Sequence, residues 1–74
     1  MKVSTADYLK GRLRTYGLTY QAASKACGMA RSTFVDKVNN PTTFRIFEFN
    51  ALAKILEIQP DVYEQLIKGE EIEI

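Results

Sequence analysis

Two short helices joined by a three-residue corner that begins with a glycine constrain the fold of this chain more than any other feature. Thr19 precedes the first helix, where its hydroxyl can accept from a free N–H group of the first turn. Gly28 ends that helix, because glycine enters the left-handed backbone region without a side-chain clash. The second helix begins at about Arg31 and ends near Asn39, since Pro41 moves the residue before it out of helical geometry. This segment therefore has the outline of a helix-turn-helix motif.

The flanking sequence predicts three more helices around the same core. Their expected bounds are about Thr5–Tyr16, about Ile46–Leu56, and a last helix that begins at Pro60 and stops at Gly69. Apolar side chains at helical spacing mark the inward faces. The expected core consists of Leu9, Leu13, Tyr16, Ala23, Ser24, Cys27, Phe34, Val38, Phe44, Ile46, Phe47, Phe49, Leu52, Ala53, Leu56, Val62, Tyr63 and Leu66. We therefore predict an all-α fold, a compact bundle of five short helices.

One domain accounts for the whole chain, residues 1–74, because 74 residues support only a single small core. Residues 69–74 form an acidic tail. Within it, Glu70–Ile74 ends in alternating Glu and Ile, which suits either a frayed terminus or a short strand. Fraying is the expectation for a chain end.

Charge is unevenly distributed along the chain. Residues 1–56 hold nine Lys and Arg against three Asp and Glu, whereas residues 57–74 hold one base against six acids. The first part therefore carries +6 and the second −5, which gives the net charge of +1. A basic body with an acidic end suits a polyanionic partner on one face, but it is equally compatible with ordinary solvated surface.

Order and spacing along the chain resemble a known family. The matching features are Leu18-Thr19, Gly28, Arg31-Ser32-Thr33-Phe34, Pro41, Phe44 and the Leu52-Ala53…Leu56 run, which together span most of residues 5–68. The chain resembles the phage repressor and Cro-type (XRE-like) helix-turn-helix proteins. This resemblance implies a lambda-repressor-like DNA-binding domain, in which the second helix of the motif, here Arg31–Asn39, enters the major groove.

The same resemblance implies which residues touch DNA. Those expected to read bases are Ala30, Arg31, Ser32, Thr33 and Asp36, and those expected to contact phosphates are Tyr20, Lys37, Thr42, Thr43 and Arg45. The chemistry suits these roles, because Arg can donate two bonds to guanine and a carboxylate can accept from cytosine. A surface ion pair between Arg31 and Asp36 is the structural alternative.

Enzyme chemistry has few candidate groups here, and no catalytic residue is assigned. The chain has no His and one Cys, Cys27, which is expected to be a small buried side chain. We expect no metal, cofactor or small-molecule ligand, and no membrane partner, because no apolar run of membrane-spanning length occurs. A cytoplasmic location, in a bacterial or phage-infected cell and associated with the nucleoid, is the corresponding expectation.

The sequence therefore favours a non-enzymatic, sequence-specific regulator of transcription that binds double-stranded operator DNA, like a phage or prophage repressor or Cro. By resemblance it would act as a homodimer. The alternative is a protein-interaction module of the same shape, such as an adaptor, an antirepressor or an antitoxin. The moderate overall charge and Asp36 on the expected reading helix support this alternative.

Overall fold

Five α-helices make up most of residues 1–73, the part of the chain that this computed structural model describes. The helices are α1 (Thr5–Thr15), α2 (Tyr20–Ala26), α3 (Arg31–Asn39), α4 (Ile46–Leu56) and α5 (Pro60–Lys68), and a 3-10 turn, η1 (Pro41–Thr43), joins α3 to α4. Two short strands, β1 (Lys2–Val3) and β2 (Ile72–Glu73), lie at the ends. The number of helices and their order are as the sequence predicted, and the bounds agree to within one residue.

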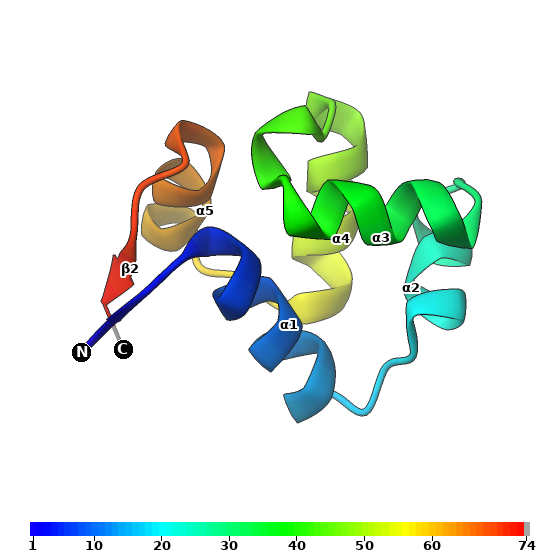
Figure 1. Ribbon diagram of the computed structural model, residues 1–74, viewed down its shortest axis with the longest axis horizontal. Coiled ribbons are helices and arrows are strands. Elements are labelled where there is room, and N and C mark those ends of the chain that lie inside the picture. The colour runs from blue at the N-terminus through cyan, green and yellow to red at the C-terminus, as the bar shows by residue number, and fades with distance from the viewer. Residues whose placement is uncertain (74) are drawn as a thin grey trace.

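Local signals fix the first helices and the turn after α2. The Ser4 hydroxyl accepts from the Asp7 N–H at 3.2 Å, and the Thr19 hydroxyl accepts from the Ala22 N–H at 3.1 Å, so both caps satisfy a free donor of the first turn. Gly28 has a φ of +71°, the left-handed conformation that reverses the chain between α2 and α3. From this turn, α3 runs back toward the end of the molecule that holds both termini (Figure 1).

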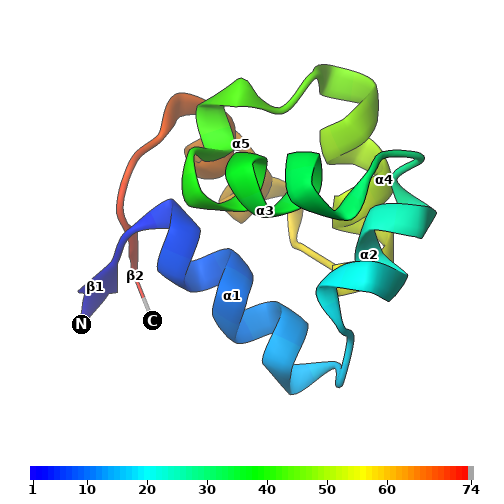
Figure 2. The same ribbon diagram turned by 45° about the vertical axis from the view of Figure 1, so that its right-hand side comes forward.

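The two ends of the described chain pair with each other. Val3 lies opposite Ile72 and Lys2 opposite Glu73 in an antiparallel register, and Figure 2 shows β1 and β2 side by side at the end of the molecule away from α2. The expectation that the tail frays is therefore wrong for Ile72 and Glu73, and the small sheet adds to the predicted all-α fold. Ile72 is 1% exposed, because alternation along the strand turns it toward the core. The part of that expectation concerning Ile74 lies outside the described residues.

A chain of aromatic rings runs through the core from α2 to α5. Phe34, which has no exposed surface, lies 6.0 Å from the Tyr20 ring and 6.2 Å from the Phe44 ring. Phe49 continues the chain at 5.5 Å from Phe44 and 5.0 Å from Tyr63. Most of these pairs are edge-to-face, the arrangement that aromatic quadrupoles favour. Because one ring chain links four elements, the orientation of α3 depends on the packing of its neighbours.

Three residues predicted for the core lie at the surface, and one of them, Phe47 on the first turn of α4, is 65% exposed. Ile46 is 75% exposed, because the first turn of α4 passes the end of the core and Glu48, not Ile46, faces α3 there. Tyr16 is exposed at the end of α1, where its hydroxyl donates to the Glu57 carboxylate at 2.8 Å. Arg12 joins α1 to the end of α4 by donating to the Leu56 carbonyl at 2.6 Å.

Among residues 1–73 none of the helices combines the length and the hydrophobicity that a membrane span requires.

Candidate nucleic-acid interface

Helix α3 has one packed side and one open side. Phe34 and Val38 are buried, and this packing fixes the rotation of the helix about its axis. Every residue expected to read bases is exposed, namely Ala30, Arg31, Ser32, Thr33 and Asp36. Ser32 and Asp36 are one helical turn apart, so they share a face. Arg31 is three residues before Phe34, on the same stripe of the helix, and is exposed because it lies in the first turn. The predicted set therefore surrounds the start of α3, and we call these exposed residues the open face of α3.

No carboxylate neutralises Arg31 on this open face. Within residues 1–73 the ion pairs involve other groups, and neither Arg31 nor Asp36 belongs to one. The surface ion pair considered for these two residues is therefore not formed. Ala30 occupies the N-cap position of α3 and provides no side-chain hydrogen bond. The exposed Arg31 guanidinium and the backbone N–H groups of the uncapped first turn of α3 are therefore available to an outside acceptor.

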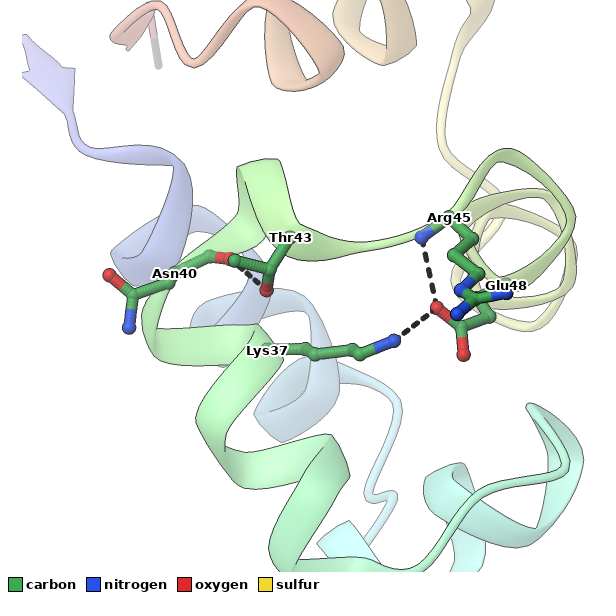
Figure 3. Close-up of polar contacts among 5 residues, drawn as sticks. All are labelled: Lys37, Asn40, Thr43, Arg45 and Glu48. Atoms are coloured by element: carbon green, nitrogen blue, oxygen red, sulfur yellow. Dashed lines mark hydrogen bonds and ion pairs between the residues drawn. The ribbon is translucent and has the colours of Figure 1, made fainter.

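The other end of α3 is joined to α4 by one carboxylate. Glu48 accepts from the Lys37 amine at 2.5 Å and, through the same oxygen, from the Arg45 backbone N–H at 2.9 Å. Figure 3 shows Lys37 extending from α3 toward Glu48, with the Arg45 nitrogen on the other side of that oxygen. Both side chains are largely covered, with 17% of Lys37 and 10% of Glu48 exposed. We call Lys37, Glu48 and the Arg45 N–H the α3–α4 joint.

Electrostatics at the joint favour the charged carboxylate. Hydrogen bonding to the Lys37 amine, with help from the Arg45 N–H, lowers the pKa of Glu48 below its ordinary value of 4.5. Burial raises the pKa of the Cys27 thiol, and the negative charge of Glu48 raises it further. Cys27 is 7% exposed and is a free thiol, as the sequence predicted. The joint therefore keeps its ion pair at neutral pH while the nearby thiol stays protonated.

The residues expected to contact phosphates divide into three groups. Thr42, Thr43 and Arg45 are exposed on the connection between α3 and α4, and the Thr43 hydroxyl donates to the Asn40 carbonyl at 2.7 Å. Tyr20 begins α2 and is half-buried, with its ring packed against Phe34.

Lys37 differs from the others because its charge is already paired with a carboxylate within the joint. Sequence reasoning missed Glu48 as its partner. The available signal was an acid three residues after Arg45, the N-cap residue of α4, a spacing at which a carboxylate commonly accepts from the N-cap N–H.

Within residues 1–73 no three His, Cys, Asp or Glu side chains gather in a way that could hold a metal ion. Comparison with protein-family models, with curated proteins and with solved structures gives no match to this chain. The functional argument consequently depends on the geometry of the open face and its flanks.

Proposed function

We propose that this chain is a sequence-specific, double-stranded DNA-binding regulator of the phage repressor or Cro type, and that α2 and α3 form its helix-turn-helix. The observation that carries the proposal is the open face of α3, where polar side chains stand exposed and Arg31 has no internal partner among the described residues. A helix of this kind fits the major groove with its first turn nearest the bases.

Each side chain of the open face has a base-reading role in this proposal. Arg31 donates a bidentate pair to the N7 and O6 of a guanine, the commonest specific contact. Ser32 and Thr33 donate or accept at neighbouring base edges, and Ala30 lies against a thymine methyl group. Asp36 accepts from a cytosine amino group. A carboxylate is repelled by phosphates, so Asp36 belongs over bases and not over the backbone.

Phosphate contacts flank this reading surface. The exposed Arg45 and the Thr42 hydroxyl lie past the end of α3, where they can follow the DNA backbone. The Thr43 hydroxyl reaches a phosphate by exchanging its bond to the Asn40 carbonyl for one to the phosphate. Tyr20 at the start of α2 supplies a hydroxyl at the other flank. One module of this size buries only about 600–1,000 Å² on DNA. The proposal therefore includes a homodimer that places two α3 helices about 34 Å apart on a two-fold symmetric operator.

A selection followed by a salt titration tests this function. Duplexes enriched from a randomised library at low salt serve as the specific probe, and a scrambled duplex serves as the non-specific one. Arg31→Ala should lose the preference for the enriched duplex. Arg45→Ala should weaken both duplexes alike and reduce the slope of log affinity against log salt by about 0.9 for its one phosphate. Lys54→Ala, an exposed base on α4, is the control. A wild-type chain that binds no duplex at low salt would contradict the proposal.

One observation favours the alternative of a protein-interaction module. Ile46 and Phe47, on the first turn of α4, are 75% and 65% exposed. Two adjacent large apolar side chains in solvent are typical of surfaces that contact another protein. Under this alternative the same fold serves as an adaptor, antirepressor or antitoxin. A double variant, Ile46→Ser with Phe47→Ser, should then lose the partner, whereas under the DNA-binding proposal it should retain selective duplex binding.

A further inference from the structure

Lys37 is placed where a base could serve either DNA or the protein. It lies in the last turns of α3, one residue after Asp36 of the open face, and its amine is 2.5 Å from Glu48 Oε1. Only 17% of the Lys37 side chain is exposed, compared with full solvent contact for an ordinary surface lysine. Its charge is therefore already compensated inside the fold.

Moving this amine to a phosphate would be unfavourable for the joint. Glu48, with 10% of its side chain exposed, would be left as a largely buried carboxylate without its counter-charge. That carboxylate would also stand close to the approaching backbone of the DNA and repel it. The Arg45 N–H would remain its principal partner.

The geometry points to a positioning role for Lys37 and Glu48, in place of a phosphate contact by Lys37. Oε1 of Glu48 binds the Lys37 amine of α3 and the N–H of Arg45 at the same time. It thereby fixes the base-reading helix relative to the residue proposed to hold the backbone (Figure 3). The inference rests on the proposed function and deepens it, because it makes sequence preference depend on two residues that touch no base.

The two roles predict opposite patterns of binding. If Lys37 contacts a phosphate, Lys37→Met weakens specific and scrambled duplexes equally, and Glu48→Gln strengthens both because it releases the amine. If Lys37 and Glu48 position α3, either substitution shifts the reading helix relative to Arg45. Specific binding then falls more than non-specific binding in both variants, and the salt slope stays near that of the wild-type protein.

The test measures the affinity ratio between the enriched and scrambled duplexes for the wild type, Lys37→Met and Glu48→Gln. We expect the ratio to fall about tenfold in both variants, the scale of one lost base contact, with salt slopes unchanged within about 0.3. Lys54→Met is the matched control, since it removes an exposed lysine from α4. Far-UV circular dichroism at the assay temperature confirms that each variant is folded, and any variant that is not is replaced by Lys37→Gln or Glu48→Ala.

The outcomes separate this inference from the proposed function. The positioning role alone is overturned if the wild type prefers the enriched duplex and the variants keep the same enriched-to-scrambled affinity ratio. It is also overturned if Lys37→Met reduces the slope of log affinity against log salt by about 0.9. A wild type that binds no duplex overturns both. Equal loss of the ratio in Lys37→Met and Glu48→Gln, with Lys54→Met unchanged, supports both.

Discussion

The packed side and the open side of α3 belong to one nine-residue helix, but the fold constrains only the packed side. On the packed side, Phe34 and Val38 are buried and Lys37 is ion-paired, so the fold accounts for each of them. On the open side, Arg31 and Asp36 have no ion pair within residues 1–73, and folding does not require their charges. The difference separates residues that hold the helix from residues that are free to meet a partner.

The largest expected effect contrasts one residue from each side. Phe34→Ala should lower the free energy of unfolding by about 3–5 kcal/mol, because it leaves a cavity in the middle of the aromatic chain. Ser32→Ala, two positions earlier on the open face, should change it by less than about 0.5 kcal/mol. Urea denaturation followed by circular dichroism measures both. Similar losses in the two variants would remove the distinction between the sides.

A second prediction concerns the pH dependence of the α3–α4 joint. Glu48→Gln should lower the free energy of unfolding by about 1–3 kcal/mol at pH 7, since the charged hydrogen bond to Lys37 is lost. The pKa of Glu48 is lowered in the folded protein, so its contribution is complete above the ordinary pKa of 4.5 and disappears as pH falls through the folded value.

The wild type and Glu48→Gln should therefore converge in stability under acid conditions. Urea titrations at several pH values measure this convergence. Glu64→Gln is the control, because it removes an exposed pair with Lys68 that solvent screens and that should therefore contribute little to stability. A stability difference that does not shrink as pH falls below 4.5 would contradict the assigned role of the ion pair.

A third prediction tests how the connection after α3 is held. Gly69 has a φ of +74°, and a Cβ there would lie 3.1 Å from Cγ2 of Thr42 on η1. Gly28 has a similar φ of +71° but open space around it. Gly28→Ala should lower the free energy of unfolding by about 1 kcal/mol, because alanine is strained at a positive φ. Gly69→Ala should lower it further, because the close contact with Thr42 adds to the same backbone strain. Equal decreases in the unfolding temperature of Gly69→Ala and Gly28→Ala would mean that η1 moves aside without measurable cost.

The smallest expected change in stability is at Ala30, the N-cap residue of α3, which we call the tip of the open face. Ala30→Ser should raise the free energy of unfolding by about 0.5–1 kcal/mol, because a serine hydroxyl can accept from the Thr33 N–H. If the tip meets DNA, this more stable variant should nevertheless bind the enriched duplex less well. Ala26→Ser, at an exposed position of α2, is the control and should change neither quantity appreciably. Improved stability with unchanged binding would argue against contact at residue 30.

Features that depend on neighbouring residues were predictable from the sequence. Thr19 and Gly28 act through their own helix and turn, so α2, the turn and α3 could be placed without knowledge of the fold. The exposure of Ser32 and Asp36 followed in the same way from the buried positions of Phe34 and Val38. These are short-range patterns, in which helical periodicity decides which side faces inward.

Features that depend on contacts between distant segments were not predictable. Ile72 is buried because its strand pairs with Val3 at the other end of the chain. Ile46 shares the helical spacing of core residues, but it lies past the end of the core. Similarly, the pairing of Lys37 with Glu48 depends on how α4 returns against α3. In each case packing between elements, and not local pattern, determines the outcome.

The most direct test of the central claim is an NMR titration of the isotopically labelled chain with the enriched duplex. If the open face of α3 reads DNA, the amide signals of residues 30–36 should shift most, followed by those of residues 42–45, while residues 60–73 change least. Shifts confined to the surface around Ile46 and Phe47, or no shifts at low salt, would contradict it.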